Sequence, residues 1–394
     1  MPVYLDHAAT TPVFRGVAAA MAEQLAHCGN PSSLHTSGRA ARRVVEESRE
    51  RLAAAVGAGP SEVVFTSGGT EADNLAVAGV YRARRAADPR RRRLLVSAIE
   101  HHAVLDCAEA LAERDGAEVI RLPVDAGGVV PVEAVRAAVL AAPDSVALVS
   151  VMWANNEVGA VADIPAIAAV AHEHGIPMHS DAVQAVGHLP VDFATCGADL
   201  LALTGHKLGG PIGAGALLAR RDQAVVPLVH GGGQERQIRS GTLDATGVLG
   251  LSLAVEHAVA QLHSEAERLC RLRDDLIEGA LAVADGIRVG GPWRRGDWSC
   301  RLAGNAHFII EGCEGDSLLY LLDAAGVECS TGSACHAGVP QPSHVVLAMG
   351  VPEQQARGTL RITLGHSSTE ADVAAFLAAL PAVIERARRA AGIA

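Results

Sequence analysis

The stretch "ALTGHKLGGP", residues 202–211, contains the only lysine of a chain of 394 residues. Lysine and arginine together number 33, so every other basic residue of these two types is an arginine. An arginine stays protonated, whereas a lysine amine can lose its proton and attack a carbonyl carbon. A biased composition explains why lysine is rare, but not why one is kept at position 207. The residues around Lys207 must therefore show whether it was kept by chance or for a reaction of its amine.

The sequence around this stretch predicts a mostly parallel sheet. Short apolar runs alternate with helical patterns, which is typical of an α/β fold with helices on both faces of the sheet. We expect strands at residues 62–66, 93–98, 118–124, 146–152, 177–182, 199–204 and 215–220, and helices at 71–86, 102–115 and 163–174. The connection before residues 215–220 is too short for a helical crossover, so that strand is expected to pair antiparallel.

The rest of the chain predicts a second, smaller α+β unit. An amphipathic pattern over residues 247–283 indicates one long helix with a break. A strand at 305–312, a helix at 315–326, a strand at 359–365 and a terminal helix at 369–390 are expected to follow. We therefore predict a large domain over residues 16–258. Residues 1–15 and 259–394 form the small domain, which carries a polar loop at about 327–342.

Composition narrows the class of protein. No apolar run approaches the roughly 20 residues of a membrane span, and the start "MPVYLDHAATTP" has no pattern of a signal peptide. The net charge of −11 argues against direct contact with nucleic acid. The eight cysteines contain no CxxC pair, which favours free thiols in a reducing compartment. We expect a cytoplasmic protein that does not enter a membrane.

Polar residues follow five of the predicted strands at the point where each strand ends. They are "SGGTEADN" after 62–66, His101 and His102 after 93–98, "ANNEVG" after 146–152, Asp181 and Gln184 from "SDAVQ", and Thr204, His206 and Lys207 from "TGHK". Each motif alone is explained by a helix cap or a turn. Together they fall on the carboxyl edge of one sheet, where open α/β sheets bind ligands.

These residue types suit pyridoxal phosphate. A glycine turn at the start of a helix binds a phosphate through backbone amides. Lys207 supplies an amine for an imine with the aldehyde, and Asp181 supplies a carboxylate for the pyridinium nitrogen. The sequence therefore predicts a pyridoxal phosphate site at this edge.

At this point the chain resembles a known family. It looks like a cysteine desulfurase of the class V aminotransferase group, with fold type I, of the housekeeping kind that supplies sulfur for iron–sulfur clusters. The resemblance covers nearly the whole chain. It rests on the segments "YLDHAATTP", "GNPSSLH", "TSGGTEADN", "EHHAVLD", "NNEVG", "SDAVQAVGHLPVD", "TGHKLGGPIGAGAL", "HGGGQERQIRSGT", "STGSACHAG" and "LRITLGH", in this order.

The resemblance implies a role for each matching position. Lys207 is expected to be the Schiff-base lysine, Asp181 the pyridinium partner, and His101 a ring-stacking residue that also moves protons. The other expected contacts are Asn156 and Gln184 near the ring hydroxyl; Gly69, Thr70, Thr204 and His206 at the phosphate; Thr242 at the phosphate of the neighbouring subunit in a homodimer; and Asn30 and Arg361 at the substrate carboxylate.

The resemblance also gives Cys335 a role. This residue lies in "CSTGSACHAGVPQPS", the longer of the loop types found in the family. The resemblance implies that L-cysteine becomes L-alanine and that Cys335 carries the sulfur as a persulfide. Acceptors would be proteins such as an iron–sulfur scaffold or a tRNA thiolation enzyme. No resident metal is predicted, although Cys335 is a candidate for transient ligation of a cluster.

Two neighbours of Cys335 stand out. Cys329 is expected to pack in the core, in preference to a resolving or metal-binding role, because C-x5-C is no standard zinc spacing. His336 stands where many relatives have a small hydroxyl residue, and we hypothesise that it lowers the pKa of Cys335.

Other activities remain open at this level. The alternatives are an aminotransferase, a selenocysteine lyase, a desulfurase devoted to tRNA or DNA thiolation, and a non-catalytic scaffold that docks sulfur acceptors. Cys335 argues against an aminotransferase, and the presence of both Lys207 and Cys335 argues against a scaffold. Measuring alanine formation from cysteine and from selenocysteine would distinguish a selenocysteine lyase from a cysteine desulfurase.

Overall fold

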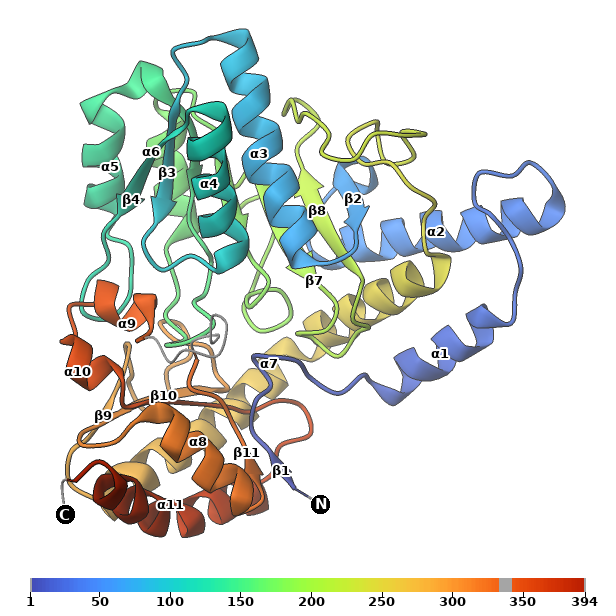
Figure 1. The fold of residues 1–394 in the computed structure, drawn as a ribbon. Coiled ribbons are helices and arrows are strands. Elements are labelled where there is room, and N and C mark those ends of the chain that lie inside the picture. The colour runs from blue at the N-terminus through green and yellow to red at the C-terminus, as the bar shows by residue number, and fades with distance from the viewer. Residues whose placement is uncertain (1, 333–341, 393–394) are drawn as a thin grey trace.

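A seven-stranded sheet lies at the centre of the larger unit of the molecule (Figure 1). The computed structural model describes residues 2–332 and 342–392. The strands are β2 (Val63–Thr66), β3 (Arg93–Ser97), β4 (Glu118–Leu122), β5 (Val146–Ser150), β6 (Met178–Asp181), β7 (Leu200–Thr204) and β8 (Gly215–Ala219), in the order β2-β8-β7-β6-β5-β3-β4. All seven predicted strands are confirmed. β8 pairs antiparallel with β7, as its short connection predicted, and it also pairs antiparallel with β2.

Helices cover both faces of this sheet. One face packs against α3 (Gly69–Ala87) and α4 (His102–Asp115). The other packs against α1 (Arg15–Leu25), α2 (Thr36–Ala55), α5 (Val132–Ala141), α6 (Ile164–His172) and the first half of α7 (Ala245–Val283). Successive strand residues alternate between the two cores: Val63 and Phe65 face one, and Val64 faces the other. Short 3₁₀ turns, η1 (Pro60–Glu62) and η2 (Pro143–Ser145), precede β2 and β5.

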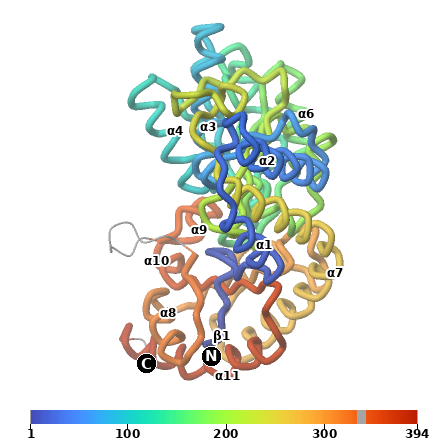
Figure 2. Tube along the Cα trace, turned by 90° about the vertical axis from the view of Figure 1, so that its right-hand side faces the viewer, coloured from blue at the N-terminus to red at the C-terminus, as the bar shows by residue number. Residues whose placement is uncertain are grey.

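The smaller unit is built on a three-stranded antiparallel sheet, in the order β12-β10-β9. Its elements are β9 (Ile287–Val289), β10 (Asn305–Ile310), α8 (Gly315–Ala324), β11 (Val327–Glu328), α9 (His344–Ala348), α10 (Glu353–Ala356), β12 (Thr359–Thr363) and α11 (Glu370–Ala390). The strand β1 (Val3–Tyr4) joins this unit by pairing parallel with β11. Figure 2 shows the two units one above the other, with β1 and α11 in the lower unit. The exact domain boundaries stay a prediction.

Helix α7 belongs to both units. Val248, Leu251 and Val255 are buried in the core of the larger unit, whereas Leu272 and Leu276 are buried in that of the smaller one. The predicted break is absent, because α7 contains no proline and continues without interruption from its cap at Asp244. By length and composition α7 could cross a membrane, but its burial in two cores accounts for the same apolar content.

Candidate active site

A pocket of about 420 Å³ opens at the carboxyl ends of the parallel strands. The predicted site residues that line it are Gly69, Thr70, His101, Asn156, Asp181, Gln184, Thr204, His206, Lys207 and Arg361. The sheet supplies most of these residues, because the turns after β2, β3, β5, β6 and β7 meet at one edge. Arg361 comes from β12, so the pocket lies between the two units.

Lys207 is held by two backbone carbonyls. Its Nζ donates hydrogen bonds to the oxygens of Ala8 and Ala9, at 2.6 and 2.7 Å. Burial, together with the nearby charge of Arg361, lowers the pKa of Lys207 to about 8. A neutral amine is therefore accessible near neutral pH, as nucleophilic attack on an aldehyde requires. Sequence reasoning gave no role to Ala8 and Ala9, although they lie in the quoted segment "YLDHAATTP".

Asp181 ends β6 at the floor of the pocket. Its Oδ1 accepts a hydrogen bond from the Val183 N–H at 2.9 Å. Burial and the neighbouring Asp73 raise the pKa of Asp181 to about 7, against a smaller opposing effect of His101. The raised pKa shows that the neighbouring charges in the described part of the chain do not offset the burial of this carboxylate. A pyridinium nitrogen would supply a positive charge there, so the site fits the cofactor.

His101 is the N-cap of α4 and faces the pocket. Its Nδ1 accepts a hydrogen bond from the Ala103 N–H at 3.1 Å, so the proton of the neutral ring is on Nε2. Burial lowers the pKa of His101, which keeps the ring neutral. The neutral ring can stack on a flat cofactor and donate a proton from Nε2.

The turn before α3 leads into Gly69 and Thr70, which line the pocket. Gly68 has a φ of +152°, which glycine adopts without strain. A Cβ on Gly69 would lie 2.7 Å from Val183 Cγ2, so no larger residue fits there. The N-terminus of the 19-residue helix α3 directs its free amides toward the pocket. Burial and Lys207 lower the pKa of the adjacent His206 to about 4, so the His206 ring is neutral near neutral pH.

Arg361 enters the pocket from the smaller unit. Its Nη2 donates to Asp6 Oδ1 at 2.7 Å, and its Nη1 donates to the backbone oxygen of Asn156 at 3.0 Å. Its buried Nε has no hydrogen-bond partner in the described part of the chain. The guanidinium is thus fixed in place with a donor to spare, as a site for a carboxylate needs. Asp6 was not predicted as a site residue.

Comparison with known proteins places this geometry in a family. The model of the family described as aminotransferase class-V matches residues 3–376. The chain belongs to the aminotransferase class-V family. It is 58% identical over 388 residues to an "IscS-like cysteine desulfurase" of Mycobacterium tuberculosis, and the match covers 98% of each chain.

Solved structures of class-V relatives agree with the fold. A NifS-like protein has a TM-score of 0.88 and 32% identity, and the match covers 98% of this chain and 100% of that one. A structure described as "SspA in complex with cysteine" has a TM-score of 0.77 and 34% identity, over 92% of this chain and 98% of that one. The predicted fold type I is confirmed, and class-V enzymes of this kind depend on pyridoxal phosphate.

Two predicted class-V residues do not line the pocket. Asn30 is exposed in the connection between α1 and α2, which projects from the body of the molecule (Figure 1), and its Oδ1 accepts from the Ser32 N–H. Thr242 is also exposed. The segment before Thr242 contacts the first turn of α3, because Arg239 Nε donates a hydrogen bond to Glu71 Oε1 at 2.9 Å. The single chain therefore does not bring Asn30 beside Arg361. Asn30 and Thr242 are both exposed to solvent.

Cys335 and His336 lie outside the described residues. The residues that flank their segment are described: Ser330 and Gly332 line the pocket. On the other side Ser343 donates a hydrogen bond to the buried Glu157. Ser330 and Gly332, before Cys335, thus lie at the pocket, whereas Ser343, after it, is held at Glu157, the neighbour in sequence of the pocket residue Asn156.

Cys329 lies in the core of the smaller unit, where the prediction of a packing residue places it. Burial, with a smaller effect of Asp6, raises the pKa of the Cys329 thiol to about 12, so this thiol is inert. Within residues 2–332 and 342–392 no group of three or more His, Cys, Asp or Glu residues is arranged to hold a metal ion.

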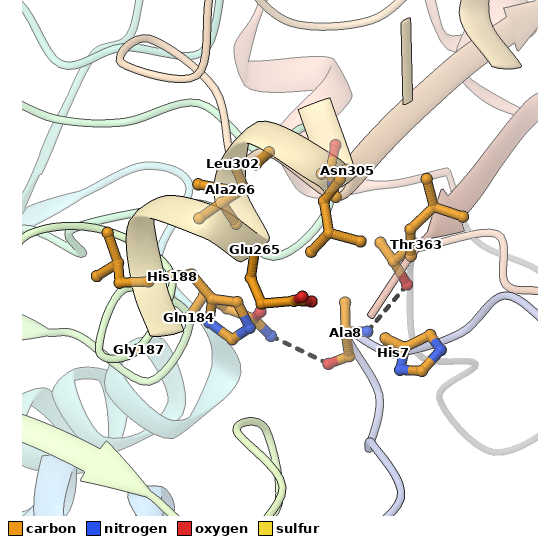
Figure 3. Close-up of a pocket in the computed structure, with 15 residues that line it drawn as sticks. His7, Ala8, Gln184, Gly187, His188, Glu265, Ala266, Leu302, Asn305 and Thr363 are labelled. Atoms are coloured by element: carbon orange, nitrogen blue, oxygen red, sulfur yellow. Dashed lines mark hydrogen bonds between the residues drawn. The ribbon is translucent and has the colours of Figure 1, made fainter. Parts of the chain in front are cut away.

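A smaller cavity of about 50 Å³ lies behind the carbonyl of Ala8 (Figure 3). Gln184 Nε2 donates to the Ala8 oxygen at 3.0 Å, and the Ala8 N–H donates to Thr363 Oγ1 at 2.9 Å. These bonds join the larger unit, the N-terminal segment and β12. They fix the carbonyl that receives Lys207, so Gln184 supports the site from this side as well as lining it.

Proposed function

We propose that the chain converts L-cysteine to L-alanine, leaves the sulfur as a persulfide on Cys335, and supplies it for iron–sulfur cluster assembly. The chain is a pyridoxal phosphate-dependent cysteine desulfurase, as its relatives over nearly their whole length are. The observation that carries the proposal is a single pocket that joins Lys207, Asp181 and Arg361 with Ser330 and Gly332, which precede the Cys335 segment. The cysteine-bound relative supports L-cysteine as the substrate.

The chain's own residues divide the work. Arg361 binds the substrate carboxylate, because its guanidinium is already fixed by Asp6. Asp181 keeps the ring nitrogen protonated. Bound at Lys207, pyridoxal phosphate withdraws electrons from the α-carbon of the amino acid joined to it. Lys207, once released, takes the proton from that carbon as a general base, which its lowered pKa permits.

Cys335 completes the reaction in this proposal. Its thiolate forms a sulfur–sulfur bond with the substrate sulfur while the carbon–sulfur bond breaks. The electron pair of the broken bond stays with the carbon, which takes up a proton and leaves as alanine. His101, with its proton on Nε2, is the proposed donor of that proton. The persulfide then passes its outer sulfur to an acceptor, and no other oxidant or reductant is required.

The protein is proposed to act as a cytoplasmic homodimer. Leu25 and Leu34, on either side of the projecting connection that carries Asn30, are 73% and 88% exposed. Burial of these two side chains by a second subunit would stabilise a dimer. The seven described cysteines are all free, which suits a reducing compartment. The proposed acceptor is an iron–sulfur scaffold protein; a tRNA thiolation enzyme is the alternative, and a pull-down that traps mixed disulfides with Cys335 would distinguish them.

Replacing Cys335 tests the proposal. Cys335→Ala is expected to keep the absorbance of the bound cofactor, because Lys207 is intact. It is expected to lose sulfide release from L-cysteine in an assay that contains a thiol, which reduces the persulfide sulfur to sulfide. Cys28→Ala is the matched control, because Cys28 is an exposed free cysteine. Wild-type sulfide release by Cys335→Ala would contradict the assignment.

A further inference from the structure

A buried group of polar side chains lies around Asp181, and the mechanism above gives it no role. One member, Asp73, also lines the active-site pocket. Asp73, Glu100, Ser150 and His179 are each at most 1% exposed. The group contains two carboxyls besides that of Asp181. Buried carboxyls without a matching cation are costly, so this arrangement needs an explanation.

The fold brings two of these groups face to face. His179 and Asp181 are two residues apart on β6 and so share one face of the sheet. Helix α3 packs on that face and places Asp73 Oδ1 at 3.4 Å from His179 Nε2. Neither atom has a hydrogen-bond partner in the described part of the chain. The other ring nitrogen, Nδ1, lies 2.9 Å from Ser150 Oγ. One proton between Asp73 and His179 would satisfy both.

Burial decides the charge state of the pair. Asp73 and His179 could form an ion pair or a neutral pair that shares the same proton. Burial raises the pKa of Asp73 to about 8 and lowers the pKa of His179 to about 4. Both shifts disfavour charge, so the proton belongs on the carboxyl.

Burial also favours the neutral form of the Glu100 carboxyl. Its Oε1 accepts a hydrogen bond from the Met152 N–H at 2.6 Å, and its Oε2 has no partner in the described part of the chain. Burial and the proximity of Asp181 raise the pKa of Glu100 well above its usual range. Two of the three carboxyls are therefore neutral.

We propose that Asp73 and His179 are positioning residues for the cofactor. Protonated Asp73 donates to His179 Nε2, His179 donates from Nδ1 to Ser150 Oγ, and Asp181 is left as the single negative charge under the ring nitrogen. This neutral chain fixes the end of β6 against α3 without adding a second charge. The inference rests on the proposed place of Asp181 at the ring.

The other ionisable groups around the cluster come from several elements. They are Glu100 before α4, His101 at the start of α4, Cys107 within α4, and Lys207 after β7. His101 and Lys207 face Asp181 from the pocket, whereas Glu100 and Cys107 lie near Asp73. The cations near these groups are Lys207, Arg361 beside Lys207, and Arg82 beside Cys107. In the described part of the chain none of them offsets the burial of Asp73, whose pKa is raised by burial alone.

Two substitutions at Asp73 test the proposal. The cofactor-free variants are titrated with pyridoxal phosphate to obtain the dissociation constant, and the absorbance of the bound cofactor is followed against pH. Asp73→Leu removes the donor to His179 and is expected to weaken binding about tenfold. Asp73→Asn keeps a donor without a charge and is expected to rescue the affinity to within about threefold, with an unchanged titration of the absorbance. Asp106→Asn, the same change at an exposed site on α4, is the control.

The outcomes separate the competing explanations. If Asp73→Asn weakens binding as much as Asp73→Leu, or shifts the absorbance titration, then Asp73 carries a charge and the proposal fails. If Asp73→Leu does not fold, His179→Asn is expected to show the same weakening, and wild-type affinity in that variant overturns the proposal. Asp181→Asn tests the site itself: tight binding by that variant would refute the placement of the cofactor, not only the neutral chain.

Discussion

Lys207 shows how the surroundings of one residue create its chemistry. Arginine could replace a solvated lysine in this arginine-rich chain, but it forms no imine. The carbonyls of Ala8 and Ala9 fix Nζ in the pocket, and burial lowers its pKa to about 8 from the 10.5 of a free side chain. The same amine is therefore both positioned and partly neutral at physiological pH, which composition alone could not indicate.

The lowered pKa of Lys207 predicts how cofactor attachment depends on pH. The neutral amine is the nucleophile, so the rate at which cofactor-free protein binds pyridoxal phosphate covalently should rise with pH and level off above about 8. Rapid-mixing absorbance measurements would follow the reaction. A free lysine derivative, as a control for ionisation of the reagent, should level off only near pH 10.5. A protein rate that keeps rising to that pH would contradict the prediction, and Lys207→Arg should not react at any pH.

At the scale of elements, the part of the site that follows the parallel strands was predictable. Each strand is a short apolar run that ends at a polar turn, and parallel strands place those turns at one edge. Asp181 and Lys207 could therefore be placed together without a structure. The long helix α7 was predicted with a break that it lacks, because its apolar face continues from one core into the next and the pattern gives no reason to stop.

The N-terminal part of the site could not be predicted from local patterns. Asp6 and Ala8 reach the pocket because β1 pairs with β11 over two residues, a contact too short to leave a periodic signal. Asp73 was also missed. An acidic residue near the start of a helix usually favours the helix dipole at the surface, and only the packing of α3 on β6 shows that it is buried.

Strand β8 packs closely against the turn before α3, at Gly68, and this contact can be tested by substitution. A Cβ on Gly215 would lie 2.7 Å from the backbone of Gly68 and 2.8 Å from the oxygen of Leu203. Gly215→Ala should therefore displace the turn, destabilise the fold by about 1–3 kcal/mol and weaken binding of pyridoxal phosphate. Thermal unfolding and cofactor titration measure the two effects.

The matched control for Gly215→Ala is Gly16→Ala on α1. A Cβ at Gly16 has no atom within 4 Å, so alanine there should leave cofactor binding unchanged and slightly stabilise the helix. Equal behaviour of the two variants would show that the contact between β8 and the turn does not matter for the site.

At the scale of the whole molecule, the pocket is assembled from both units. Asp181 and Lys207 belong to the sheet of the larger unit, whereas Ser330 and Arg361 belong to the smaller one. The proposed contacts to the cofactor and the proposed contact to the substrate carboxylate therefore come from different cores, which are joined by α7 and by the bonds around Ala8. A rotation of one unit against the other would change substrate binding more than cofactor binding.

The proposed dimer predicts complementation between two inactive variants. Lys207→Ala cannot attach the cofactor. Thr242→Asp places a negative charge where Thr242 is expected to reach the phosphate of the neighbouring subunit. A mixed dimer would contain one intact site, with Lys207 from one chain and Thr242 from the other. With statistical mixing, half the dimers are mixed and half of their sites are intact, so desulfurase activity should return to about a quarter of the wild-type value.

A second mixture makes this test decisive. Lys207→Ala combined with Asp181→Asn should stay inactive, because each chain then spoils its own site and the mixed dimer has no intact one. Two affinity tags would isolate the mixed dimers, and light scattering would report their mass. A monomeric mass would refute the dimer. Inactivity of the isolated mixed dimers of Lys207→Ala and Thr242→Asp is the other contrary outcome. That result would show that Thr242 does not contribute to the partner's site, because the Thr242→Asp chain still supplies all the other proposed cofactor contacts of its own site.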